Sequence, residues 1–132
     1  MKRSHRLQVV VDLKENNEKK CLEALAVEQI KKQQKEEQIS NLQNYRQDYL
    51  NKNSEQMKQG LSIFHLREFQ AFIMKIDDAV KSEEKLLVAL QTRVVQLQDL
   101  WEKAHLNTKN MQKIQTEAKS SEQKALDKKE QL

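Results

Sequence analysis

The sequence predicts an all-α protein that folds as a long antiparallel two-helix coiled-coil hairpin. The chain has 132 residues, a single glycine at position 60 and no proline, so almost nothing in it ends a helix. Gly60 lies close to the middle and leaves two arms of similar length. Apolar residues recur along the second arm with a heptad period, which indicates a partner helix. We therefore expect a single domain over residues 1–132, with a helix at about 5–57, a turn at about 58–63 and a helix at about 64–128.

The composition supports a thin helical seam rather than a thick globular core. Hydrophobic residues make up 37% of the chain and charged residues 33%, which is typical of a coiled coil. The net charge of +4 is a small excess of 24 basic over 20 acidic residues. The two signs interleave along the chain, whereas a nucleic-acid-binding protein gathers its basic residues on one face. We therefore expect no nucleic-acid partner.

The first arm has an irregular apolar pattern. Its apolar clusters lie at residues 7–13, 21–30 and 39–50, and the segment 31–38 between the second and third clusters is entirely polar. No single heptad frame of apolar residues connects the three clusters, so we expect a stutter or a poorly packed segment there. The arm also starts with several basic residues, and positive charge is unfavourable at the start of a helix. The first residues are therefore expected to be loose.

The chain around Gly60 has the composition of a tight reversal. Gly60 suits the left-handed conformation that ends a helix, and Ser62 can cap the next helix through its hydroxyl. Leu61 before that cap and Leu66 after it have the spacing of a hydrophobic staple. The alternative is one continuous helix through Gly60 that dimerises with a second copy. The staple spacing favours the hairpin.

The second arm carries a regular heptad seam. Starting at Leu66, alternating steps of three and four residues meet apolar side chains almost without interruption to Ala104, and the pattern weakens beyond Met111. Such a repeat predicts a left-handed supercoil. The stretch 113–132 has few apolar residues and is expected to be mobile. The predicted seam positions are Leu66, Phe69, Ile73, Ile76, Val80, Glu83, Leu87, Leu90, Val94, Leu97, Trp101, Ala104, Thr108, Met111, Gln115, Ala118, Glu122 and Ala125.

No combination of residues in the sequence points to catalysis. One glycine cannot form a glycine-rich phosphate loop. His5, His65 and His105 lie far apart and have no neighbours at ligand spacing, so each is expected at the surface. A thin hairpin also lacks the concave pocket that a small-molecule site needs. We therefore expect a protein that is not an enzyme and that binds no cofactor or metal.

The single cysteine and the hydropathy pattern predict a cytoplasmic protein. Cys21 is the only cysteine, so no intramolecular disulfide can form, and its apolar neighbours predict a small buried thiol. No segment approaches the run of about 18 apolar residues that spans a bilayer. We therefore expect no insertion into the membrane.

Two helical stripes near the turn form a candidate partner-binding surface. Each stripe follows the spacing i, i+4, i+7, i+11, so its members share one face of a helix. In a hairpin folded about Gly60 the members of the two stripes pair at equal heights. These residues either bind a partner, because an exposed apolar patch marks an interface, or form the seam between the arms. The stripes comprise Gln38, Leu42, Tyr45 and Tyr49 on the first arm and Phe72, Ile76, Ala79 and Glu83 on the second.

These same residues carry a resemblance to a known family. Across nearly its whole length the chain resembles FliJ, the small coiled-coil protein of the bacterial flagellar type III export apparatus. The most specific features are the Tyr-x3-Tyr element, the turn glycine and the Phe-Gln-x-Phe-Ile element, in this order. The matching residues are Glu36-Glu37-Gln38-Ile39, Leu42, Tyr45, Asp48-Tyr49, Met57, Gly60, Phe69-Gln70, Phe72-Ile73, Ala79-Val80 and Trp101.

The resemblance implies a fold similar to the rotor stalk of rotary ATPases, and a set of partners. Such a stalk stands in a hexameric flagellar export ATPase and promotes its assembly and hydrolysis. It also binds the cytoplasmic domain of the membrane export gate and is described as an escort for export chaperones. This places the protein in the cytoplasm, peripherally associated with the inner membrane. Ring contacts are implied near residues 7–21 and 108–125.

The resemblance also assigns the gate-binding surface to the eight residues of the two stripes, from Gln38 to Glu83. Glu83 departs from the family, in which a neutral or basic residue is expected at this place. Three alternatives stay open: the equivalent stalk of a virulence type III secretion system, a generic structural coiled-coil dimer, and a nucleic-acid-binding helical protein.

Overall fold

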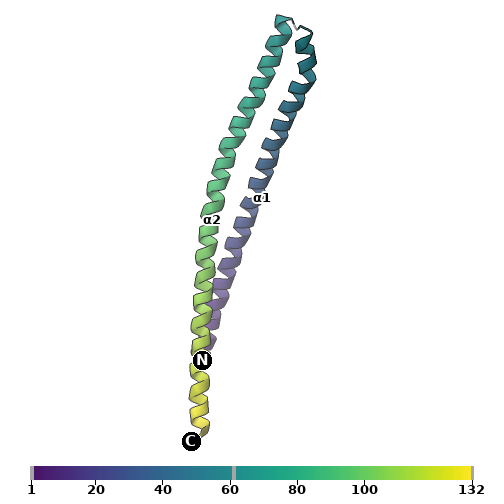
Figure 1. Cartoon of the computed structure of the whole chain (residues 1–132). Helices are drawn as coiled ribbons and strands as arrows, with labels where there is room; N and C mark the ends of the chain where they lie inside the picture. The colour runs from purple at the N-terminus through teal and green to yellow at the C-terminus, as the bar shows by residue number, and fades with distance from the viewer. Residues whose placement is uncertain (1, 61, 132) are drawn as a thin grey trace. The chain divides into compact units, whose positions relative to one another are not determined.

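The computed structural model describes residues 2–60 and 62–131, and within them two helices and no strand occur. Helix α1 spans Arg3–Lys58, and helix α2 spans Ile63–Gln131. The two helices run antiparallel and lie side by side (Figure 1). The predicted all-α helical hairpin is therefore confirmed.

The hairpin consists of two compact units. One unit pairs residues 2–27, which include the start of α1, with residues 94–131 of α2, and the other is Glu28–Arg93, which contains the turn. Each unit is built from one stretch of α1 and one stretch of α2. The organisation of the whole chain as a single domain stays a prediction.

The turn has the backbone geometry that its sequence suggests. Gly60 has a φ of 86°, in the left-handed region that only glycine enters without strain. The N–H of Gly60 donates to the carbonyl of Met57 at 3.3 Å, which closes the end of α1. The hydroxyl of Ser62 accepts the N–H of His65 at 3.3 Å, the bond of an N-cap residue. The predicted staple involves Leu61, which lies outside the described residues.

The seam of α2 follows the predicted heptad positions closely. Every predicted position from Phe69 to Glu122 is buried or half-buried, while Leu66 and Ala125 at the two ends are exposed. The polar positions Thr108 and Gln115 are among the buried residues, at 3% and 7% exposure. The seam thus continues beyond Met111, where the apolar pattern weakens. Helix α2 itself continues to Gln131, although residues 123–131 are exposed.

Of the two alternatives expected for α1, the stutter is wrong, whereas the looser packing fits the segment between Leu25 and Ile39, where no residue is fully buried. One heptad frame connects the whole helix, and each of its positions is buried or half-buried, including several that carry charged side chains. Lysine and arginine can lay their aliphatic stems along the seam and keep their charged groups at its edge. There Lys35 and Arg46 pair with acids of α2, whereas Lys32 pairs with Glu36 of its own helix. The sequence pattern hides this frame because its positions are not all apolar. They are Ser4, Leu7, Val11, Lys14, Glu18, Cys21, Leu25, Glu28, Lys32, Lys35, Ile39, Leu42, Arg46, Tyr49 and Asn53.

The apolar core is thin, as expected for two helices. A cluster of buried apolar residues in the first unit joins Leu25 of α1 to Val94 and Leu97 of α2, each 5–6% exposed. Cys21 lies one turn away in the same frame and is half-buried, so it is less covered than predicted. Many other apolar side chains face solvent, among them Leu13 at 64% exposure.

Candidate partner-binding surface

Four aromatic side chains pack together near the turn in the unit Glu28–Arg93. Tyr49 of α1 lies over Phe72 of α2, with ring centroids 4.1 Å apart, and also stacks on Phe69 at 5.4 Å. Tyr45 meets the edge of Phe72 at 5.9 Å. Edge-to-face and offset contacts of this kind stabilise aromatic pairs beyond simple area burial. The pairing of Tyr49 with Phe72 matches the equal distances of the two stripes from Gly60.

The eight predicted residues divide into two groups. Leu42, Tyr49, Ile76 and Glu83 occupy seam positions, and each is buried or half-buried. Gln38, Tyr45, Phe72 and Ala79 each stand one position before a seam residue and flank the seam. Ile76 is 6% exposed, whereas Tyr45 is 55% exposed. The seam interpretation therefore applies to four of the eight residues, and the other four lie beside the seam.

The end of this surface away from the turn is polar. Lys35 of α1 reaches across the seam to Glu83 of α2, with Nζ 2.6 Å from Oε2. The same ammonium group donates to the side-chain oxygen of Gln38 at 3.1 Å. A shallow hollow of about 430 Å³ lies beside this pair, lined by Gln38, Asn41, Leu42 and Glu83. Sequence reasoning placed Gln38 and Glu83 on the surface but missed Lys35 and Asn41.

A second ion pair closes the seam nearer the turn. Arg46 of α1 donates to Asp77 of α2, with Nε 2.8 Å from Oδ1. Both side chains are more than one-third exposed, so the pair contributes little to stability. Arg46 is itself a half-buried residue of the α1 seam frame.

The first unit contains a polar clasp between the start of α1 and the last turns of α2. The carboxylate of Glu122 accepts the backbone N–H of Ser4 at 3.1 Å and its hydroxyl at 2.7 Å. The side-chain amide of Gln115 donates to the Ser4 carbonyl at 3.2 Å and to the Gln8 side chain at 2.6 Å. A carboxylate at the start of a helix is favourable for the helix dipole. The expected looseness of the first residues is therefore offset by an acid from the opposite helix.

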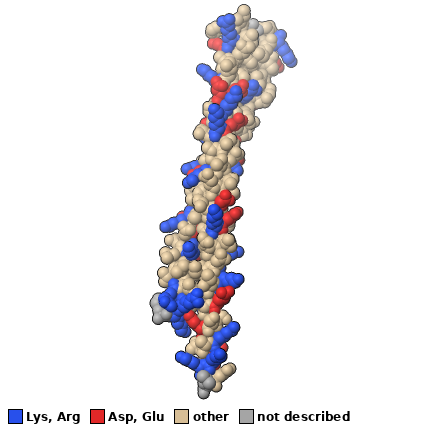
Figure 2. Space-filling model, turned by 90° about the vertical axis from the view of Figure 1, so that its left-hand side faces the viewer, with Lys and Arg blue, Asp and Glu red and all other residues tan. Residues whose placement is uncertain are grey.

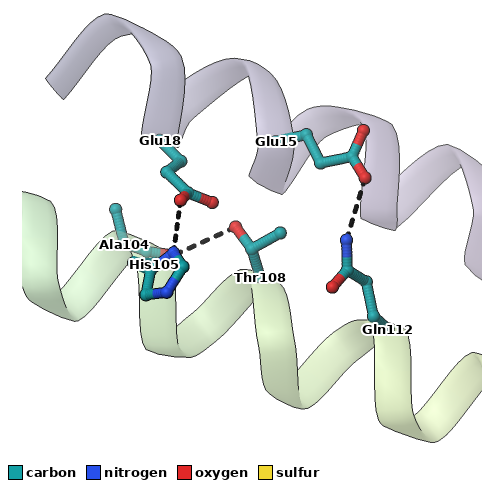
Figure 3. A network of polar contacts seen from close by, with 6 residues as sticks. All are labelled: Glu15, Glu18, Ala104, His105, Thr108 and Gln112. Atoms are coloured by element: carbon teal, nitrogen blue, oxygen red, sulfur yellow. Dashed lines mark hydrogen bonds and ion pairs between the residues drawn. The ribbon is translucent and has the colours of Figure 1, made fainter. Parts of the chain in front are cut away.

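A second polar network joins the helices a few turns from the clasp (Figure 3). His105 Nδ1 lies 2.5 Å from the carboxylate of Glu18, and Gln112 donates to Glu15 at 3.0 Å. The carboxylate can only accept, so the proton of this bond is on the histidine nitrogen. The His105 ring also stacks on Trp101, with centroids 5.0 Å apart. His105 thus takes part in the packing of the unit.

These hydrogen bonds lower the pKa of two carboxyl groups. The bond from His105 lowers the pKa of Glu18 below its ordinary value of 4.5. The bonds from the hydroxyl and the backbone of Ser4 lower the pKa of Glu122 in the same way. Both shifts favour the charged carboxylate, so both contacts are made by the ionised form.

Charge is distributed over the surface without a dominant sign. Lysine and arginine side chains are interspersed with aspartate and glutamate on the face drawn in Figure 2. Within the described residues no group of three or more His, Cys, Asp or Glu side chains is placed to hold a metal ion. Neither of the two helices, as far as the structure describes them, has a stretch long and apolar enough to cross a membrane.

The fold defines a class of protein: an all-α hairpin of two long helices that pack against each other. Searches of curated proteins and of solved structures each returned no significant match. A family model described as flagellar FliJ protein matches residues 2–132, essentially the whole chain. The chain therefore belongs to the FliJ family and is a protein of flagellar type III export.

Proposed function

We propose that this protein is a non-enzymatic central stalk and adaptor of the flagellar export apparatus. Its open end, formed by both termini, promotes assembly and activity of the hexameric export ATPase. The surface near the turn binds the cytoplasmic domain of the export gate protein, and the hairpin escorts export chaperones. The protein acts in the cytoplasm and is held at the inner membrane through the apparatus.

One observation carries the gate-binding part of this proposal: a half-exposed aromatic surface on two helices. Tyr45 remains 55% exposed although it touches Phe72, and Phe72 itself is half-buried. Tyrosine and other aromatic residues are enriched among the side chains that dominate binding energy at protein interfaces. The family membership supplies the export apparatus as the setting for such a partner.

The test is the affinity of the chain for the purified cytoplasmic domain of the export gate, measured by calorimetry. Phe72→Ala is expected to weaken binding by at least about 10-fold, as for a central aromatic contact. Phe64→Ala is a matched control, because Phe64 is an aromatic residue of α2 that is 66% exposed and lies outside the predicted surface. The control is expected to bind like the wild type. Equal loss in both variants, or no binding by the wild type, would contradict the proposal.

The open-end part of the proposal is supported by the clasp and by the polar network beside it. Ser4 and Glu122 hold the start of α1 against α2, so both helices are presented together at that end. A stalk that enters a ring needs its two helices held in register. The segments 7–21 and 108–125, for which ring contacts are proposed, lie in this unit.

A further inference from the structure

The polar end of the proposed gate-binding surface has a defined hydrogen-bonding character that the sequence does not reveal. It depends on Lys35, which is only 20% exposed and is not among the eight predicted residues. The Lys35 ammonium lies 2.6 Å from Glu83 and 3.1 Å from the side-chain oxygen of Gln38. One cation therefore ties together the two outermost members of the predicted surface.

Lys35 fixes the orientation of the Gln38 amide. An ammonium group is a donor with no acceptor capacity, so the amide must turn its oxygen toward Lys35. Its NH₂ group then points away from Lys35. Gln38 is exposed and lines two hollows, one of about 430 Å³ with Asn41 and Leu42 and one of about 260 Å³ with Lys31 and Gln34. Gln38 therefore borders both hollows, with its amide oxygen held by Lys35.

The contact with Lys35 neutralises the charge that Glu83 adds to the surface. The acid departs from the neutral or basic residue expected in the family, and a lone carboxylate would repel an acidic partner group. Here the charge of Glu83 is matched by Lys35 across the seam, and both side chains are mostly covered, at 20% and 27% exposure. Glu83 therefore acts with Lys35 as a neutral pair that holds the amide in place.

From this geometry we infer that Lys35 is a positioning residue that sets the specificity of the surface. It presents Gln38 as a hydrogen-bond donor to an acceptor group of the export gate, either a backbone carbonyl or a carboxylate. Apolar side chains of the gate pack beside this bond on Leu42 and Tyr45. This inference rests on the proposed binding of the gate. It adds Lys35 to the surface and gives the chemistry of the partner group.

Two variants separate this role from a merely structural one. Gln38→Glu keeps an oxygen for Lys35 but replaces the NH₂ donor with a second acceptor. The double variant Lys35→Glu/Glu83→Lys restores an ion pair across the seam but reverses its direction. Gln38 must then turn its NH₂ group toward the new acid at position 35 and present its oxygen to the partner. Gln38→Glu leaves the aliphatic part of the side chain unchanged, and the double variant moves the longer lysine stem from position 35 to position 83.

The experiment measures the affinity of the purified gate cytoplasmic domain for each variant by calorimetry, with helix content and melting temperature followed by circular dichroism. Gln38→Glu is expected to weaken binding about 10-fold, because a partner acceptor loses its donor and meets an acid. The control Gln33→Glu makes the same chemical change at an exposed glutamine of α1 that lines neither hollow, and it is expected to bind like the wild type. The double variant is expected to melt like the wild type and still bind about 10-fold more weakly.

Wild-type affinity in Gln38→Glu would overturn the inference. A double variant that matches the wild type in both affinity and melting temperature would overturn it as well. Either result, obtained while the wild-type chain binds the gate, leaves the proposed function standing. Absence of binding by the wild-type chain itself overturns the proposed gate interaction and this inference with it.

Discussion

Tyr45 and Ile76 belong to the same predicted surface, yet the structure assigns them different energetic roles. Ile76 is 6% exposed and fills the seam, whereas Tyr45 is 55% exposed and contacts Phe72 only through a ring edge. Truncating each to alanine should therefore separate stability from binding. This contrast tests the assignment of Ile76 to the seam and of Tyr45 to the binding surface.

The magnitude for Ile76→Ala follows from its burial. Removing a buried isoleucine side chain costs about 2–5 kcal/mol, and a two-helix seam can partly collapse around the gap. We therefore expect a loss of about 2–3 kcal/mol in the free energy of unfolding. The loss of affinity for the gate domain should be small under conditions where the variant is folded.

The magnitude for Tyr45→Ala is smaller for stability and larger for binding. Less than half of the side chain is covered, so truncation exposes about 90 Å², worth about 2 kcal/mol as an upper bound. The gain in helix propensity returns about 0.5 kcal/mol, which leaves a net loss of at most about 1.5 kcal/mol. Loss of an interface tyrosine is expected to weaken gate binding by about 2 kcal/mol, or about 30-fold.

The assay pairs urea unfolding, followed by circular dichroism, with calorimetric titration of the gate domain. The expected pattern is a destabilised Ile76 variant that binds and a stable Tyr45 variant that does not bind well. The opposite pattern, with helix loss in Tyr45→Ala and weak binding by a stable Ile76→Ala, would refute the division between seam and surface.

Three further predictions concern the fold. Gly60→Ala should lower the free energy of unfolding by about 1–2 kcal/mol in a urea titration, because the φ of 86° strains any residue with a Cβ. The added Cβ itself meets no atom within 4 Å, and an unchanged urea midpoint would contradict this prediction. Leu25→Ala should cost about 2–3 kcal/mol by the same method, since it opens the apolar cluster of the first unit, and a cost below about 1 kcal/mol would place that cluster outside the core. The lowered pKa values of Glu18 and Glu122 mean that their stabilising contacts are fully present above the ordinary carboxyl pKa of 4.5 and are lost as pH falls through the lowered values. Glu122→Gln should therefore reduce amide-exchange protection around Ser4 at pH 7 but change stability little at the most acid pH, and an equal effect at both pH values would exclude the clasp.

The two helices differ in how far their packing could be predicted. The seam of α2 is carried by apolar side chains such as Ile76, Val94 and Leu97, so its heptad period is visible in the sequence. The seam of α1 has the same period but includes Lys32 and Lys35, whose stems pack while their charges reach solvent or a partner. A hydrophobicity pattern treats such residues as polar and loses the frame.

The candidate surface was predictable where local spacing decides it. Tyr49 and Phe72 meet because both stand at the same height above a turn that Gly60 places. The contact of Lys35 with Glu83 joins residues 48 positions apart and depends on which flank of the seam each side chain follows. The sequence indicates only the other contact of Lys35, with Gln38, because residues three positions apart are neighbours on a helix.

The clasp of the first unit was not predictable for the same reason. The unfavourable basic start of α1 suggested loose residues, and nothing local offers a compensating acid. Glu122 supplies that acid from a position 118 residues away. Only the register of the hairpin brings it to Ser4.

The most direct test of the stalk proposal is ATP hydrolysis by the purified flagellar export ATPase, measured with and without this protein. The account predicts a clear rise in hydrolysis and in hexamer content, both lost when residues 2–21 and 108–131 are trimmed. No change in either quantity, with the chain shown to be helical by circular dichroism, would contradict it.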